Sequence, residues 1–200
     1  MKVDIASMQT GDAPAGFTAA LTGQGNKVHW QVLEDASAPG GKVIAETSRD
    51  TADYRFPLCL REDILAKDVA VAVRFKAVAG EVDQAAGLIV RALDDQNYYV
   101  ARANALEANV RLYKVTNGVR RQLAGYNIDV PSGSWQSLRL ESSGKMLRVA
   151  FNGQQLIETQ DTSIGEAGKV GLWTKADSLT HFADLEIELA HAAATGGHHA

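Results

Sequence analysis

The segment from Asp95 to Val115, DQNYYVARANALEANVRLYKV, decides the fold predicted for this chain. Side chains alternate along it with a period of two, which is typical of β-strands whose side chains point to opposite faces. The pattern covers two stretches, 98–104 and 109–113, which the short link 105–108 joins. We therefore predict two antiparallel strands that form a hairpin.

One face of this hairpin is rich in polar side chains. Its predicted members are Tyr98, Val100, Arg102, Asn104, Asn109, Arg111 and Tyr113. The opposite face carries Tyr99, Ala101, Ala103, Val110 and Leu112. Arginine, asparagine and tyrosine side chains form hydrogen bonds, so the first face would suit a polar ligand. A solvated sheet face with incidental charge explains the same pattern, and both interpretations stay open.

The same alternation extends over the chain from residue 69 onward. Segments such as VAVAVRFKA (69–77), WQSLRLES (135–142) and KMLRVAFN (145–152) follow it, and Asn-Gly pairs at 117–118 and 152–153 predict tight hairpin turns. Short strands separated by turn residues are typical of an all-β sandwich or jelly roll of two antiparallel sheets. The predicted core between the sheets consists of Val71, Val73, Phe75, Leu88, Val90, Val110, Leu112, Leu138, Leu140, Leu147, Val149, Val170 and Leu172.

Length and charge limit the function classes. The 200 residues fit one domain, which we place at 1–190, followed by a flexible tail at 191–200 whose His198 and His199 could capture a metal adventitiously. The net charge of −4 argues against a general nucleic-acid binder. We find no apolar run long enough for a membrane span, which needs about eighteen residues. Oligomeric state cannot be read from the sequence.

The N-terminal stretch MKVDIASMQTGDAPAGF lacks the apolar region of a signal peptide. The protein is therefore cytoplasmic, or the chain is a mature form with an initiator Met added. Cys59 is the single cysteine, so there is no internal disulfide. Its apolar neighbours in RFPLCLR predict a buried, inert thiol.

Several segments together resemble a known group of proteins. They are 30–48 (WQVLEDASAPGGKVIAETS), 85–115, the Trp135 strand, 151–156 (FNGQQL) and 167–185 (AGKVGLWTKADSLTHFADL). The chain resembles, from about residue 30 to residue 189, the concanavalin A-like jelly-roll domains of the bacterial 3-keto-disaccharide hydrolase group and related laminarin-lectin-like domains. The resemblance implies a concave sheet with carbohydrate as the ligand class, and a periplasmic or secreted protein.

The group name implies hydrolysis, but the catalytic pattern of related glucanases is missing. Those enzymes carry Glu-x-Asp-x-x-Glu on one strand, so that two carboxylates reach the sugar. We find no such triplet in this sequence. Glu107 is the one carboxylate within the arginine-rich hairpin, where it could act as a base or neutralise an arginine. Whether the protein is an enzyme stays open, with Glu107 as a weak catalytic candidate.

The expected ligand-binding residues are Arg91, Tyr98, Arg102, Asn104, Asn109, Arg111, Trp173 and Lys175. The arginines and asparagines would bind hydroxyl or carboxylate groups, and the two aromatic rings would stack against a sugar. Trp135 is expected in the core. Asp94 and Asp95 could hold calcium, although adjacent aspartates are also common turn residues; no other cofactor is expected.

The leading hypothesis is a lectin-like domain that binds a polyhydroxylated ligand on its concave face; whether that ligand is neutral or anionic stays open. A glycoside-directed hydrolase and a protein-interaction or structural module are the alternatives.

Overall fold

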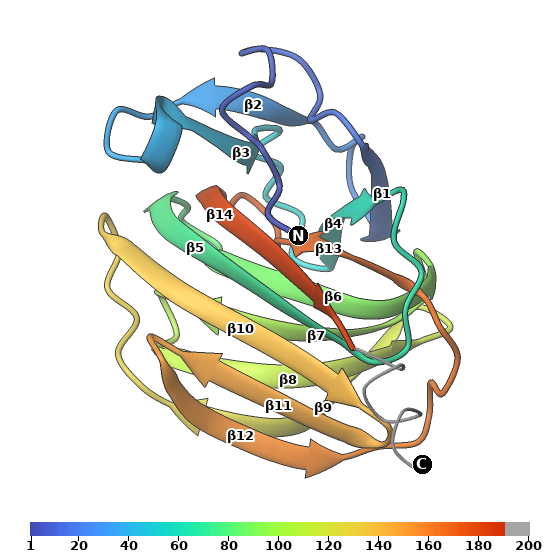
Figure 1. Ribbon diagram of the computed structural model, residues 1–200. Coiled ribbons are helices and arrows are strands. Elements are labelled where there is room, and N and C mark those ends of the chain that lie inside the picture. The colour runs from blue at the N-terminus through green and yellow to red at the C-terminus, as the bar shows by residue number, and fades with distance from the viewer. Residues whose placement is uncertain (191–200) are drawn as a thin grey trace.

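The computed structural model describes residues 1–190, which fold into fourteen strands in two antiparallel sheets (Figure 1). Sheet A consists, in spatial order, of β12 (Gln154–Gln160), β11 (Met146–Phe151), β10 (Trp135–Ser143), β5 (Val69–Ala79), β14 (Leu179–Leu189), β3 (Lys42–Glu46) and β2 (Trp30–Glu34). Sheet B consists of β1 (Phe17–Gly23), β4 (Arg55–Arg61), β13 (Lys169–Trp173), β6 (Ala85–Asp94), β7 (Asn97–Asn104), β8 (Asn109–Thr116) and β9 (Val119–Asn127). The prediction of an all-β sandwich is confirmed. One 3-10 turn, η1 (Pro39–Gly41), is the helical element among these residues, and no helix there could cross a bilayer.

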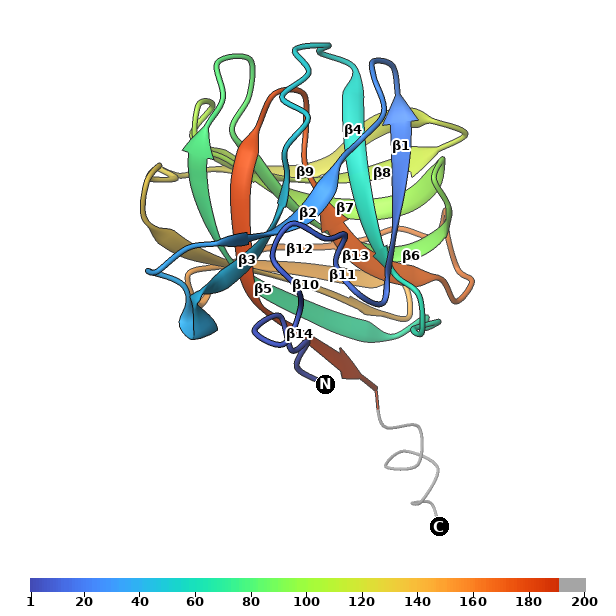
Figure 2. The same ribbon diagram turned by 90° about the horizontal axis from the view of Figure 1, so that it is seen from above.

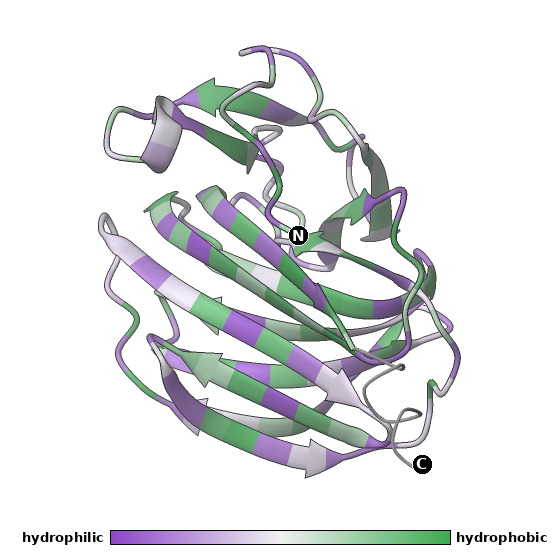
Figure 3. Cartoon of the chain, viewed as in Figure 1, coloured by the Kyte–Doolittle hydropathy of each residue, from purple (hydrophilic) through white to green (hydrophobic). Residues whose placement is uncertain are grey.

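The period of two determines which side chains enter the space between the sheets. Along β10 and β11, hydrophobic and hydrophilic residues alternate (Figure 3). All the residues predicted for the core between the sheets are buried in one hydrophobic cluster, from Val71 on β5 to Leu172 on β13. Two inner faces that interdigitate in this way exclude water from the centre of a sandwich.

Leu112 on β8 provides a direct test of this core, because its side chain is completely buried. We expect Leu112→Ala to lower the free energy of unfolding by about 2–5 kcal/mol, since it removes buried methyl groups and leaves a cavity. Urea titration followed by tryptophan fluorescence measures the loss. A change below about 0.5 kcal/mol would show that this position is not part of the core.

Sheet B is strongly curled, and its outer face is concave. In the strand order, β4 is second and β9 is seventh. At a strand spacing of about 4.8 Å, a flat sheet would hold them more than about 20 Å apart. Yet the Arg120 guanidinium on β9 lies 5.0 Å from the Phe56 ring on β4, and the Tyr54 hydroxyl just before β4 donates to the Gly118 carbonyl at 2.7 Å. The sheet therefore bends around its outer face.

The first 68 residues contain four strands that the alternation did not reveal. β1 pairs with β4 at one edge of sheet B, and β2 pairs with β3 at one edge of sheet A. The N-terminal residues run beside the end of β14, where the Val3 amide donates to the Leu185 carbonyl at 2.9 Å (Figure 2). On β4, Cys59 is buried as predicted, and its burial raises the pKa of the thiol.

Trp135 does not lie in the core, contrary to the prediction. Leu138 and Leu140 on β10 face the other sheet, so the odd-numbered Trp135 faces outward. Its ring has the cationic groups of Arg74 and Lys76 at 5.5 and 5.3 Å from its centre. The period of two predicts this outward orientation, because Trp135 is out of phase with the apolar residues that follow it on β10.

Candidate functional site

Four of the predicted ligand-binding residues lie together on the concave face of sheet B. The register pairs Arg102 with Arg111 and Asn104 with Asn109 across β7 and β8. Facing residues on paired strands are about 5 Å apart, which brings the side chains into contact. The Nη1 atom of Arg102 donates to Asn109 Oδ1 at 2.8 Å. The polar face predicted from the hairpin is therefore present in the structure.

Arg91 lies apart from this group, so the expectation that it converges with the other residues is wrong. The pairing of β6 with β7 shifts register here, and Arg91 has a φ of 51°, which turns its side chain away from the concave face. The buried guanidinium donates to the carbonyl oxygens of Lys67, Gly144 and Ile164 at 2.8, 2.6 and 2.9 Å. These contacts tie loops of the two sheets together at the far end of β6 from the polar face.

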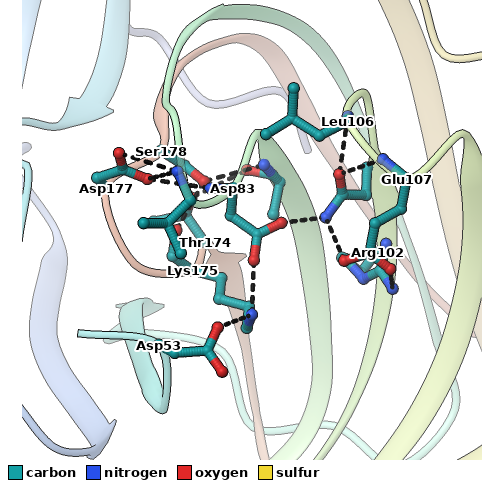
Figure 4. Close-up of polar contacts among 12 residues, drawn as sticks. Asp53, Asp83, Arg102, Leu106, Glu107, Thr174, Lys175, Asp177 and Ser178 are labelled. Atoms are coloured by element: carbon teal, nitrogen blue, oxygen red, sulfur yellow. Dashed lines mark hydrogen bonds and ion pairs between the residues drawn. The ribbon is translucent and has the colours of Figure 1, made fainter. Parts of the chain in front are cut away.

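A network of six polar side chains lies where the loops before β4 and β6 meet the end of β7; Figure 4 shows its contacts. We call it the polar network; in order it contains Asp53, Lys175, Asp83, Asn104, Glu107 and Arg102. In its first half, Lys175 Nζ donates to Asp53 Oδ1 at 2.9 Å and to Asp83 Oδ2 at 2.6 Å. Asp53 comes from the loop before β4, Lys175 from the β13–β14 turn and Asp83 from the loop before β6.

The second half of the network comes from β7 and the turn that follows it. Asn104 Nδ2 donates to Asp83 Oδ1 and, at 3.3 Å, to Glu107 Oε2. Glu107 Oε1 lies 3.7 Å from Arg102 Nη2. Asn104 Oδ1 also accepts the backbone amides of Leu106 and Glu107, at 2.9 and 3.0 Å, and so holds the turn in place. The network therefore alternates acidic and donor groups along its length.

The side chains of the network differ sharply in exposure. Those of Asp83 and Arg102 are 2% exposed, and Lys175 is 11% exposed. Asp53 is 81% exposed and Glu107 is 49% exposed. The network therefore has buried members with a solvated carboxylate at Asp53 and a half-exposed one at Glu107, which a ligand from solution can reach.

Asp177 positions the loop that carries Asp83. Its carboxylate accepts the backbone amides of Glu81, Val82 and Asp83 at 2.8, 3.1 and 3.0 Å. Burial raises the pKa of Asp177, but these hydrogen bonds outweigh the burial and hold the pKa below its usual value. An ionised Asp177 thus fixes the β5–β6 loop against the β13–β14 turn that supplies Lys175.

Charge pairing favours the ionised forms of Lys175 and Asp53. Burial lowers the pKa of Lys175, but its hydrogen bonds to Asp83 and Asp53 outweigh this effect, and the pKa rises above the usual value. The hydrogen bond from Lys175 lowers the pKa of Asp53. At neutral pH the lysine is therefore a cation between carboxylates.

Arg102 has an unused donor. Its Nη1 and Nη2 atoms donate to Asn109 Oδ1 and, at 3.0 Å, to the Tyr113 hydroxyl. Within residues 1–190, however, its buried Nε atom has no hydrogen-bond partner. A buried donor without a partner costs about 1–3 kcal/mol, which an acceptor from a ligand would recover.

The two aromatic residues expected as a stacking platform are buried. Trp173 stacks on Phe56 with ring centres 5.4 Å apart and an interplanar angle of 12°, and its Nε1 atom donates to the Tyr98 hydroxyl at 3.2 Å. Both Tyr98 and Trp173 have an exposed fraction of 0%. In this structure neither ring offers a face to a sugar, because the curled sheet encloses them in a second apolar cluster.

Asp94 and Asp95 act as turn residues. Asp94 Oδ1 accepts from the Gln96 amide at 2.8 Å and from Asn97 Nδ2 at 2.9 Å, and Asp95 Oδ1 accepts from Gln96 Nε2 at 3.0 Å. Over residues 1–190 there is no group of three or more His, Cys, Asp or Glu side chains arranged to hold a metal ion. His198 and His199 lie outside the described residues.

The prediction did not include Asp53 or Asp83. A signal for Asp83 existed, because Ala85 pairs with Asn104 in the β6–β7 hairpin and the residues just before β6 must lie beside the end of β7. Asp53 reaches the network through a loop from a distant part of the chain, and no local pattern indicates that contact.

Comparison with known proteins identifies the fold class. No protein-family model matches the chain, and a search of curated protein sequences finds no match. The carbohydrate-binding module CBM66 from Bacillus subtilis has a TM-score of 0.69 and 20% identity, over 86% of this chain and 95% of that module. A protein of unknown function with a galectin-like fold, also from Bacillus subtilis, has a TM-score of 0.59 and 12% identity, over 86% and 88%. The exoplasmic/lumenal domain of VIP36, solved with Ca²⁺ and Man3GlcNAc, has a TM-score of 0.59 and 11% identity, over 88% and 86%. The chain has a galectin-like and concanavalin A-like fold.

Proposed function

We propose that this protein binds carbohydrate through the polar network on the concave face of sheet B. The observation that carries the proposal is the unpartnered Nε atom of Arg102, a buried donor beside the half-exposed carboxylate of Glu107. A sugar hydroxyl can accept from the first group and donate to the second. Mixed donors and acceptors within a few ångströms of each other suit a polyhydroxylated ligand.

Two of the similar structures support this ligand class by what their names state. One is a carbohydrate-binding module, and the other is a domain solved with a mannose-containing oligosaccharide. The relationship to this chain is one of fold, so the site itself is argued from Arg102, Asn104 and Glu107. The protein-interaction alternative lacks a comparable feature on this face, where the apolar cluster around Trp173 is buried.

The binding test compares two buried arginines. We expect Arg102→Gln to weaken glycan binding about tenfold or more, because it removes charge-assisted hydrogen bonds worth about 1.5–3 kcal/mol. Arg91→Gln is the matched control, since Arg91 is equally buried but lies at the other end of β6. A glycan array followed by isothermal titration measures both variants, with circular dichroism confirming that each is folded.

The outcome against the proposal is equally clear. If the folded wild-type protein binds no glycan, or if Arg91→Gln weakens binding as much as Arg102→Gln, the site does not lie at the polar network.

Hydrolysis is the alternative that one contact favours. Asn104 Nδ2 lies within hydrogen-bonding distance of carboxylate oxygens of both Asp83 and Glu107. Glycoside hydrolysis by the common two-carboxylate mechanism uses two such acids near the scissile bond. The binding assay separates the two functions if each bound glycan is also incubated with the protein. New reducing ends that accumulate with time indicate hydrolysis, whereas an unchanged glycan indicates binding alone.

A further inference from the structure

Arg120 is a cation on the concave face that makes no direct ion pair within residues 1–190, although its charge contributes, after the hydrogen bond from Lys175, to the lowered pKa of Asp53. It follows the β8–β9 turn, and its guanidinium carbon lies 4.2 Å from the centre of the Tyr113 ring and 5.0 Å from that of Phe56. Within residues 1–190 its side chain forms neither a hydrogen bond nor an ion pair. The two aromatic rings hold the guanidinium in place through cation–π contacts and leave its N–H groups free to donate.

Arg102 lies against the same tyrosine. Its guanidinium carbon is 5.7 Å from the Tyr113 ring centre, and its Nη2 atom donates to the Tyr113 hydroxyl. Two guanidinium groups that share one ring repel each other unless an anion lies close to both. Glu107 approaches Arg102 only to 3.7 Å and is half-exposed, so it offsets this repulsion in part.

The balance of charge on the concave face also favours an anionic ligand. The basic side chains described on this face are Arg102, Arg111, Arg120 and Lys175, and the acidic ones are Asp53, Asp83 and Glu107. This face therefore carries one excess positive charge, although the chain as a whole has a net charge of −4. Arg111 supplies this excess, because its partner, Gln122 at 2.8 Å, is neutral and leaves its charge uncompensated.

We propose that the ligand of this site carries a carboxylate, as a uronic acid does, and that Arg102 and Arg120 bind it above Tyr113. This inference rests on the proposed carbohydrate binding and names the chemical class of the sugar. A carboxylate supplies two acceptor oxygens in the geometry that matches the fork of an arginine. Its charge offsets the repulsion between the two guanidinium groups, which a neutral hydroxyl does not do.

The experiment compares sugars that differ only in charge. The probes are polygalacturonate, alginate and glucuronan, each beside its methyl-esterified form, and titration calorimetry at low ionic strength measures binding. We expect at least one acidic polymer to bind and its neutral ester to bind about tenfold more weakly or worse. Since the contact is between charges, added salt should weaken the binding of the acidic form.

Variants of two neighbouring arginines assign the effect to the site. Arg120→Gln should weaken binding of the acidic polymer about tenfold, whereas Arg120→Lys, which keeps the charge, should recover part of the loss. Arg121→Gln is the matched control. It removes the same charge from the next residue of β9, which is exposed and pairs with Lys114 rather than with a concave-face residue.

The outcomes separate this inference from the proposed function. If neutral glycans or the methyl esters bind as tightly as the acids, the carboxylate is not recognised, while carbohydrate binding stands. If a sulfated dextran binds and no uronic acid polymer does, the anion is a sulfate and the inference is overturned. If the folded protein binds no glycan of any kind, both proposals fail.

Discussion

Replacing Lys175 with methionine should destabilise the protein by about 3–5 kcal/mol, because it leaves Asp83 as an uncompensated buried charge. The Asp83 side chain is 2% exposed, and Lys175 Nζ is its cationic partner at 2.6 Å. Methionine fills a similar volume, so the loss reports the charge rather than a cavity. Chemical denaturation at pH 7 followed by circular dichroism measures the difference.

Two further variants identify the cause. Adding Asp83→Asn to Lys175→Met removes the stranded charge and should recover most of the lost stability, since an asparagine oxygen can still accept from Asn104. Asp53→Asn alone should cost less than about 1 kcal/mol, because Asp53 is 81% exposed and a surface ion pair contributes little. If Asp83→Asn gives no recovery, Lys175 stabilises the loops through its alkyl packing instead.

Because of the same ion pair, the stability of the protein should fall at alkaline pH. The pKa of Lys175 is raised in the folded protein above the ordinary value of 10.5, so folding favours the protonated lysine. Its stabilisation is therefore fully present below about pH 10 and disappears as the pH rises through the folded-state pKa. The wild type should lose stability over this range, and Lys175→Met should not show that component.

Trp173→Ala should cost about 3–5 kcal/mol, as much as the truncation of a residue between the sheets. Trp173 is fully buried on the concave face, stacks on Phe56 and donates to the Tyr98 hydroxyl. Its removal opens a cavity and takes away one hydrogen bond of the Tyr98 hydroxyl. The Thr22 hydroxyl, 2.9 Å away, remains as the partner of Tyr98. Thermal unfolding and urea titration give the change.

Trp135→Ala is the control, because its ring lies on the outer face of sheet A between the cations of Arg74 and Lys76. This truncation should cost about 1 kcal/mol or less. Equal losses for the two tryptophans would mean that the concave face does not contain a second structural core. A large loss of ligand binding in a stable Trp173→Ala protein would instead return the ring to the role first predicted for it, as a platform for sugar.

The fold was predictable where each strand has one face in the core. From residue 69 onward, leucines and valines such as Leu112, Leu138 and Val149 recur every second residue, and their burial follows from that spacing alone. The strands of the first 68 residues are harder to recognise. β4, for example, is buried on both faces from Arg55 to Leu60, so its sequence RFPLCLR shows no alternation.

The candidate site was predictable in part, for a related reason. Alternation and a local hairpin place four residues on one face, and the paired residues are close together in the sequence. They are Arg102, Asn104, Asn109 and Arg111. Asp53 and Lys175 meet from positions 122 residues apart, and their contact depends on the complete sheet. Arg91 departs from the pattern because one residue in the left-handed region reverses which face it occupies. Trp173 and Tyr98 became core residues because curvature, which no local pattern encodes, closes the sheet around them.

The strand order also determines when the nascent chain can fold. β13 lies between β4 and β6 in sheet B, and β14 lies between β3 and β5 in sheet A. Until residues 169–189 have emerged from the ribosome, each sheet is therefore split into two parts whose inner edges have unpaired backbone groups. Such edges invite pairing with other chains. The sandwich can consequently close only when the two final strands enter the gaps that the earlier strands have left for them.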